Sequence, residues 1–275
     1  MPDPIVRTPW PNWPHKELLY ETCDNGKIAI ITGGSDGLGR AAAEKLAAEG
    51  ARVAIAARRK EHLEKEADEI RKATGGQVLA HVADVIRAAE CERLVDAVVA
   101  QWGGVDILLN NAGTSAAAAF EKVGDEAWQA DWDLKVMGAV RMSRLVIPHM
   151  KKRGGGRIVN ITTVGGKAPL PRSLPTSVTR AAGLNLTKSL ANEYAADNIR
   201  VNTICIGLVR SAQVARRAKG DLEAHYAELA ELRVPLGRVA HASEFADLFA
   251  FLVSERATYI TGASVNFDGG SGMTV

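Results

Sequence analysis

The chain has 275 residues, of which 47% are hydrophobic and 24% are charged. These proportions exclude a disordered, collagen-like or repeat-dominated chain, and the length favours one α/β domain. The formal net charge of +2 gives no whole-molecule field that would attract nucleic acid or an anionic membrane.

Residues 1–25 are rich in proline, which disfavours a long helix or a central strand. We expect an extended N-terminal arm, which Trp10 and Trp13 would pack onto the body or onto a neighbouring subunit. A mobile tail is the alternative. Residues 26–275 then form the predicted dinucleotide-binding domain.

Beyond the arm, short aliphatic or β-branched runs alternate with longer helical patterns. This alternation predicts a doubly wound parallel sheet of Rossmann type, with three layers in a single α/β domain. The helical pattern is clear in 86–102, where apolar residues recur every three to four positions and indicate a core stripe. The predicted strands lie near 27–32, 51–56, 78–82, 105–109, 157–161, 199–206 and 263–267.

A glycine-rich turn, TGGSDGLG at 32–39, follows the first predicted strand and leads into an alanine-rich helix. Glycines in this position let the backbone approach a pyrophosphate, and the free amides of the helix bind its charge. The same letters match the G-x-S-x-G nucleophile elbow of an α/β-hydrolase, but an elbow needs earlier strands to supply its oxyanion loop. Only the proline-rich arm precedes this turn. The predicted cofactor contacts are Gly33, Ser35, Asp36, Gly37, Leu38 and Gly39.

The end of the second predicted strand bears on the choice of cofactor. An NAD site usually has a carboxylate about 20 positions past the glycines, where it binds the ribose hydroxyls. Here the sequence reads Ala-Ala-Arg58-Arg59-Lys60. Guanidinium groups bind a 2′-phosphate, so NADP(H) is favoured over NAD(H), with Arg58 as the contact. The alternative is that these basic residues only begin an exposed helix.

Several further motifs occur in one order along the chain: NNAG at 110–113, PLGR at 235–238, YITG at 259–262 and DGG at 268–270. With the glycine turn, they resemble the short-chain dehydrogenase/reductase family from about residue 26 to the end. The resemblance implies redox chemistry on a small-molecule carbonyl or alcohol and a homodimer or homotetramer. It also implies cofactor contacts at Asp84, Val85, Asn111, Ala112, Gly113, Arg180, Gly207, Val209 and Ser211.

The catalytic positions that the resemblance implies carry unusual residues. In that family a serine and a tyrosine bind the substrate carbonyl, a lysine four residues after the tyrosine binds the nicotinamide ribose, and an asparagine holds a water chain. Aligned by the flanking motifs, the serine position is Thr163, the tyrosine position Thr176 and the lysine position Arg180. The asparagine position is Lys135, and no tyrosine occurs between Thr163 and Leu190.

These substitutions remove the side chains that usually transfer the proton. A threonine hydroxyl cannot replace a tyrosine as general acid, and the Arg180 guanidinium stays charged. Lys135 is the best candidate for the proton donor, because repulsion from Arg180 and burial would lower its pKa. Thr163 and Thr176 would orient or polarise the carbonyl, and Lys167 is a weaker candidate.

Purely structural roles remain open for the same residues. Lys135 could be an ion-paired helix residue bound to Asp131 or Asp133, Arg180 could form a salt bridge, and the threonines could cap backbone groups. Three functional hypotheses follow: an NADP(H)-dependent oxidoreductase with relocated proton transfer, a dinucleotide-binding lyase or isomerase without redox chemistry, and a non-catalytic subunit. The first is the leading one.

The segment after the sixth predicted strand contains a further cation, Arg210. It indicates an anionic ligand unless a carboxylate of the next segment pairs with it. That segment, 212–233, is charged and predicts one or two exposed amphipathic helices, either a lid or a solvated face.

Neither a metal site nor a disulfide framework is expected. Cys23, Cys91 and Cys205 are scattered without a CxxC motif, and the six histidines lack HxH or HExxH spacing. No apolar run approaches the about 20 residues of a membrane span. The sequence therefore predicts a cytoplasmic protein that binds neither membrane nor nucleic acid.

Overall fold

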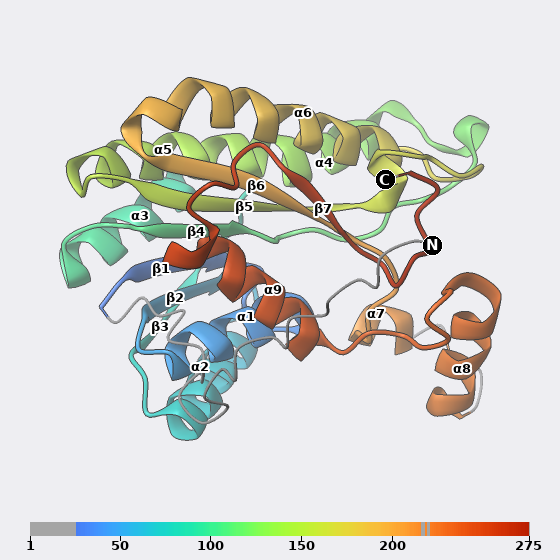
Figure 1. Ribbon diagram of the computed structural model, residues 1–275, viewed down its shortest axis with the longest axis horizontal. Coiled ribbons are helices and arrows are strands. Elements are labelled where there is room, and N and C mark those ends of the chain that lie inside the picture. Colours follow the sequence, from blue (N-terminus) through green and yellow to red (C-terminus); the bar gives the residue numbers. More distant parts are fainter. Residues whose placement is uncertain (1–25, 216–217, 219–220, 275) are drawn as a thin grey trace, which may run out of the picture.

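A seven-stranded parallel sheet runs through the protein (Figure 1). The computed structural model describes residues 26–215, 218 and 221–274, so the predicted arm, with Trp10, Trp13 and Cys23, lies outside the described residues. The strands pair in the order β3-β2-β1-β4-β5-β6-β7. Their bounds are β1 (Ile28–Thr32), β2 (Arg52–Ala57), β3 (Val78–Val82), β4 (Ile107–Asn110), β5 (Gly156–Thr163), β6 (Ile199–Ile206) and β7 (Ser264–Phe267).

The central strands are apolar on both faces because helices cover the sheet on both sides. All five residues of β1 are buried. Its residue Ile30 pairs with Ala54 of β2 and with Leu108 of β4. Continuous apolar runs of this kind are what the sequence shows, and the predicted α/β sheet is confirmed.

Helices form the two outer layers (Figure 1). One face packs against α1 (Gly37–Ala48), α2 (Lys60–Thr74) and α9 (Ala242–Val253), and the other against α3 (Ala88–Trp102), α5 (Gly138–Lys152) and α6 (Thr176–Tyr194). The predicted stripe in 86–102 is buried in the second face. The remaining helices are α4 (Asp125–Trp132), α7 (Ala212–Ala215), α8 (Leu222–Arg233), the 3₁₀ turns η1 (Phe120–Lys122), η3 (Val164–Gly166), η4 (Ala195–Asp197) and η5 (Glu255–Ala257), and the π-helical turn η2 (Asp133–Met137).

The sheet has a topological switch point between β1 and β4. From β1 the chain first builds outward through β2 and β3, and then returns to the other side of β1 with β4. Since every strand is parallel, the carboxyl ends of all strands lie at one edge. Ligands of open α/β sheets bind in the crevice outside these ends at such a point. The fold therefore brings the turn after β1 and the loop after β4 together.

The described residues of the segment 212–233 include two helices, α7 and α8, in agreement with the predicted number. Asp221 caps α8, because its side chain accepts a hydrogen bond from the Ala224 amide. Tyr226 and Ala230 of α8 are buried in a small cluster apart from the two main cores. Helix α8 thus lies beyond the carboxyl edge of the sheet, at the end where the switch point is found (Figure 1). Within the described residues, no helix is both long enough and apolar enough to cross a membrane.

Candidate functional site

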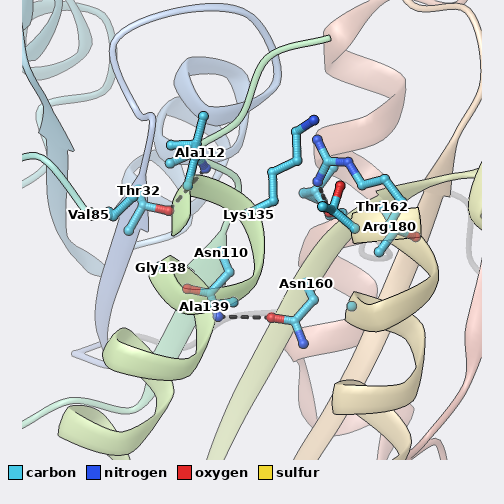
Figure 2. Close-up of a pocket in the computed structure, with 14 residues that line it drawn as sticks. Thr32, Val85, Asn110, Ala112, Lys135, Gly138, Ala139, Asn160, Thr162 and Arg180 are labelled. Atoms are coloured by element: carbon cyan, nitrogen blue, oxygen red, sulfur yellow. Dashed lines mark hydrogen bonds between the residues drawn. The ribbon is translucent and has the colours of Figure 1, made fainter. Parts of the chain in front are cut away.

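A pocket opens at the carboxyl edge beside the switch point (Figure 2). It draws its walls from the ends of β1, β4 and β5, from the start of α5 and from the first turns of α6. The lining residues are Thr32, Val85, Asn110, Ala112, Leu134, Lys135, Gly138, Ala139, Asn160, Ile161, Thr162, Thr179, Arg180 and Gly183.

The glycine-rich turn after β1 is held by the loop after β4. The Asn111 side-chain amide donates to the carbonyls of Thr32 and Gly33, both at 3.1 Å. The Thr32 hydroxyl accepts from the backbone amides of Asn111 and Ala112. A Cβ placed on Gly39 would lie 2.3 Å from the Gly33 carbonyl oxygen, so only glycine lets the helix start this close to the turn. The backbone is therefore shaped as a cradle for an anion.

Other predicted cofactor contacts surround this cradle. Gly33 has a φ of +65°, which glycine adopts without strain. Ser35 is buried, and the Asp36 carboxylate accepts a hydrogen bond from the Gly37 amide, so that it caps α1. Leu38 packs on the core. The amides of Gly33 and Gly34 donate to the Ala56 carbonyl, so the turn is also anchored to the end of β2.

The remaining predicted contacts follow the neighbouring strands at the same edge. Arg58 is exposed after β2, and Asp84 and Val85 follow β3, with Val85 lining the pocket. Gly207 follows β6, and a Cβ on it would lie 2.7 Å from the Asp268 Cβ. Val209 bridges to Ala240. Ala112 and Arg180 line the pocket, and Gly113 and Ser211 lie outside its lining.

Lys135 is buried in the pocket wall. It belongs to the π-helical turn η2, a kind of turn that occurs frequently at functional sites. Its Nζ donates a short hydrogen bond to the Asp131 carboxylate and a second bond, 3.0 Å long, to the Thr176 hydroxyl. The Lys135 side chain is only 1% exposed. Burial, with repulsion from Arg180, lowers the pKa of Lys135 to about 8. The Asp131 carboxylate opposes this shift, because it stabilises the charged ammonium form.

Arg180 lies next to Lys135, and the two side chains extend toward one another in Figure 2. Its Nη1 donates to the Ile161 carbonyl at 2.5 Å, and its Nη2 would be 2.8 Å from a Cβ on Gly113. Its Nε is buried and has no hydrogen-bond partner. Burial lowers the pKa of Arg180 to about 10, although Asp131 opposes the shift. The guanidinium is therefore held in place in the wall of the pocket.

The two threonines predicted to act on the substrate differ in their surroundings. Thr176 begins α6, and its hydroxyl oxygen accepts hydrogen bonds from Lys135 Nζ and from the Ala116 amide at 3.1 Å. Thr163 ends β5 and lies outside the lining of the pocket. Thr176 does not line the pocket either, but it contacts the pocket residue Lys135. The structure thus brings Lys135, Thr176 and Arg180 together and leaves Thr163 apart from them at the end of β5.

Two other basic residues, Lys167 and Arg210, bind partners outside the pocket lining. Lys167 Nζ donates to the Ser264 carbonyl at 2.8 Å and to the Asn266 side chain at 2.7 Å, so it fastens the loop after β5 to β7. Arg210 forms a two-pronged ion pair with Glu223 of α8 and lies over the Tyr226 ring. The carboxylate of the next segment therefore pairs with Arg210, as one of the two sequence interpretations has it.

Sequence reasoning did not assign a role in the site to Asp131 or Thr179. Asp131 accepts from Lys135 with one carboxylate oxygen and from the Thr179 hydroxyl, at 2.7 Å, with the other. The four-residue spacing of Asp131 and Lys135 signals an ion pair on one helix face. Nothing in the sequence signals the contact with Thr179, which lies 48 residues further along the chain.

A chain of buried polar side chains forms the floor beneath the pocket. Asn110 donates to Asn160 at 2.8 Å (Figure 2), and Asn160 donates to Thr187 at 2.9 Å. Thr187 in turn lies 2.6 Å from the Thr203 hydroxyl. These side-chain hydrogen bonds join β4, β5, α6 and β6 to one another.

Comparison with known proteins places this arrangement in a family. Residues 33–272 match the family model described as enoyl-(acyl carrier protein) reductase. The bovine protein named dehydrogenase/reductase SDR family member 4 is 36% identical over 248 residues, which cover 90% of this chain and 88% of the relative. The chain belongs to the short-chain dehydrogenase/reductase family. It is an oxidoreductase, as the resemblance of its motifs predicts.

Solved structures of short-chain dehydrogenases/reductases have the same architecture. L-sorbose reductase from Gluconobacter frateurii, in complex with NADPH and L-sorbose, superposes with a TM-score of 0.89 and is 37% identical, covering 93% of this chain and all of that one. An NADPH-bound short-chain oxidoreductase from Pseudomonas aeruginosa, described as containing an atypical catalytic center, also has a TM-score of 0.89. It is 34% identical, with coverage of 92% of this chain and all of that one.

The described part of the chain contains no group of three or more His, Cys, Asp or Glu side chains arranged to hold a metal ion. Cys91 and Cys205 are both buried and free, and burial raises the pKa of each thiol. The titratable groups that the pocket does bring together are Lys135, Arg180 and Asp131.

Proposed function

We propose that the protein is an NADP(H)-dependent oxidoreductase that interconverts a small-molecule carbonyl and the corresponding alcohol, and that Lys135 supplies the proton. The observation that carries this proposal is the Lys135 ammonium group, which is buried in the pocket wall and bonded to the Thr176 hydroxyl. The pocket lining contains no tyrosine within the described residues. A lysine whose pKa is about 8 can donate and accept a proton near neutral pH.

The cofactor fits the residues that are present. The glycines of the turn between Gly33 and Gly39 let the backbone approach a pyrophosphate closely, and the start of α1 offers it the positive end of a helix dipole. The place of Arg180 in the pocket lining supports a role in binding ribose hydroxyls, and exposed Arg58 supports one in binding a 2′-phosphate. The NADPH found in the two structural relatives supports the same choice. When bound, the reduced nicotinamide supplies the hydride, so the protein has only a proton to provide.

Thr176 is the group that we expect to pass this proton to the substrate. Both hydrogen bonds recorded at its hydroxyl oxygen come from donors, Lys135 Nζ and the Ala116 amide. Its own hydrogen is therefore left for a further acceptor, such as the substrate oxygen. In reduction the substrate oxygen takes the Thr176 hydrogen while the Thr176 oxygen takes a proton from Lys135. Thr176 then carries no full negative charge, and Lys135 ends neutral.

This proton path accounts for a family member without the usual serine, tyrosine and lysine. The relative from Pseudomonas aeruginosa, described as containing an atypical catalytic center, supports the view that an unusual center is compatible with NADPH binding. The comparisons give no support to a lyase, an isomerase or a non-catalytic subunit, because the relatives named above are a reductase, an oxidoreductase and a dehydrogenase/reductase.

The test is a Lys135→Met variant assayed on a panel of carbonyls and alcohols by the absorbance of the reduced nicotinamide. We expect kcat to fall by about 100-fold or more, the usual contribution of a positioned acid or base. NADPH affinity, measured by fluorescence titration, should change little. Lys152→Met, which removes an exposed lysine at the end of α5, is the matched control and should keep its activity. Full activity of Lys135→Met would contradict the proposal.

The pH profile follows from the same pKa. Reduction needs the ammonium form of Lys135, so kcat for reduction should be constant well below pH 8 and fall as the pH rises through about 8. Oxidation needs the neutral amine, so its kcat should rise through the same range. Steady-state rates measured in both directions from pH 6 to pH 10 would check this, and profiles that move in the same direction would contradict it.

A further inference from the structure

Asp131 has no assigned role, yet it is the only carboxylate that contacts the cations of the pocket among the described residues. We propose that Asp131 is a positioning residue that acts through Lys135, fixing its ammonium group against Thr176 and supplying the negative charge that keeps it there. This inference rests on the proposed function and adds to it the residue that orients the proton donor.

The contacts of Asp131 leave it no freedom. It lies in the last turn of α4, four residues before Lys135, and its side chain is 2% exposed. One carboxylate oxygen accepts from Lys135 Nζ, and the other accepts from the Thr179 hydroxyl at 2.7 Å. Thr179 is itself 1% exposed and lies one turn after Thr176 on α6. The carboxylate thus joins the helix that carries the donor to the helix that carries the relay.

The charges explain why a carboxylate is needed at this place. Lys135 and Arg180 are neighbouring cations in a pocket sheltered from solvent. Like charges and burial both favour loss of the lysine proton, whereas an adjacent carboxylate favours its retention. Arg180 faces Lys135 from α6 and Asp131 faces it from α4. The rest of the described lining contributes no titratable side chain.

Removal of the carboxylate should therefore have two effects on Lys135. Its pKa should fall further below the ordinary value, because the group that raises it is gone while Arg180 and burial remain. Its side chain should also lose the bond that aims it at Thr176. Both effects act on the proton-transfer step, so kcat should fall with little change in KM.

The chain offers a matched control two residues away. Asp133 accepts from the Gln129 side chain at 2.9 Å and pairs with Arg141 at 3.5 Å, and it does not line the pocket. Asp133→Asn removes the same charge from the same stretch of helix without touching Lys135. Thr179→Val and Thr179→Ser form a second pair, in which only the serine keeps a hydroxyl for Asp131.

The experiment is a titration of Lys135 in full-length protein with ¹³C-labelled lysine, followed by NMR. The Lys135 signal is the one missing from Lys135→Met. In Asp131→Asn we expect its midpoint to move to lower pH by about one unit or more. In Thr179→Val it should move the same way by less, and in Thr179→Ser and Asp133→Asn it should stay in place. An unchanged or higher midpoint in Asp131→Asn would overturn the proposal, and Thr179→Val decides if Asp131→Asn does not fold.

Turnover by the same variants separates this inference from the proposed function. The descending limb of reduction in Asp131→Asn should move with the NMR midpoint, and kcat at pH 8 should fall about fivefold or more, as expected when the protonated fraction of Lys135 falls from about one half to about one tenth. A shifted midpoint with unchanged kcat would overturn the positioning role. Full activity of Lys135→Met, in contrast, would overturn the proposed function while leaving the NMR coupling between Asp131 and Lys135 intact.

Discussion

At the scale of single residues, the site depends on where two cations are placed and what each one contacts. Arg180 is held by the Ile161 carbonyl in the pocket lining, which suits a binding role. Lys135 is held by Asp131 and touches Thr176, which suits proton transfer. The two positive charges therefore suit different tasks, because their partners differ.

Arg58 is the residue on which the proposed preference for NADP(H) rests. We expect Arg58→Ala to raise the Kd for NADPH about tenfold, since a charge-assisted hydrogen bond contributes about 1.5–3 kcal/mol and 1.4 kcal/mol is a factor of ten. The Kd for NADH should not change, because NADH lacks the 2′-phosphate. Fluorescence titration with both nucleotides measures this. Arg59→Ala, at the neighbouring N-cap of α2, is the control, and equal losses for NADPH and NADH in Arg58→Ala would contradict the prediction.

The sequence predicts some of these residues and not others. Alignment of local motifs is enough to single out Lys135 and Arg180, because each lies a fixed distance from a recognisable flank. The bond between Asp131 and Thr179 depends on how α4 packs against α6, and no local pattern encodes that contact. The ion pair of Arg210 with Glu223 is open in the sequence for the same reason.

At the scale of elements, the fold is well predicted because the signals are strong. Buried parallel strands are continuous apolar runs, and helix α3 carries an apolar stripe with the period of a helix. The π-helical turn η2 has no comparable signal. It places Lys135 within the pocket wall only because the helix register changes between α4 and α5.

The turn between β1 and α1 is the element whose geometry tolerates least change. We expect Gly39→Ala to abolish NADPH binding and to lower the Tm, because its Cβ would lie 2.3 Å from the Gly33 carbonyl. Gly124→Ala is the matched control, since its Cβ would meet nothing within 4 Å and its φ is −74°. Fluorescence titration and thermal unfolding measure both effects. A Gly39→Ala protein that binds NADPH normally would show that the turn can open without loss.

At the scale of the whole molecule, the candidate site draws on the carboxyl ends of several strands, from β3 through β6. A ligand that contacts the ends of all these strands binds only the native state, because a partly folded state lacks some of the contacts. Its binding free energy therefore adds to the stability of the entire sheet.

We expect NADPH at about 100 times its Kd to stabilise the protein by about 2.7 kcal/mol and to raise the Tm by about 5 °C or more. Lys135→Met should show the same increase, because the cradle and Arg180 are intact in that variant. Thermal unfolding with and without the nucleotide, followed by circular dichroism, measures the shift. A Tm that does not respond to NADPH would contradict the assignment of the cofactor.

The buried chain from Asn110 to Thr203 gives the pocket a stiff base. Each polar group of this base has its partner inside the protein, so replacement of any one of them leaves the next without a partner. Helix α8, by comparison, is tied to the body by contacts such as the solvent-exposed pair of Arg210 and Glu223, which contribute little to stability. Substitutions in α8 should therefore cost the protein less stability than substitutions in the base.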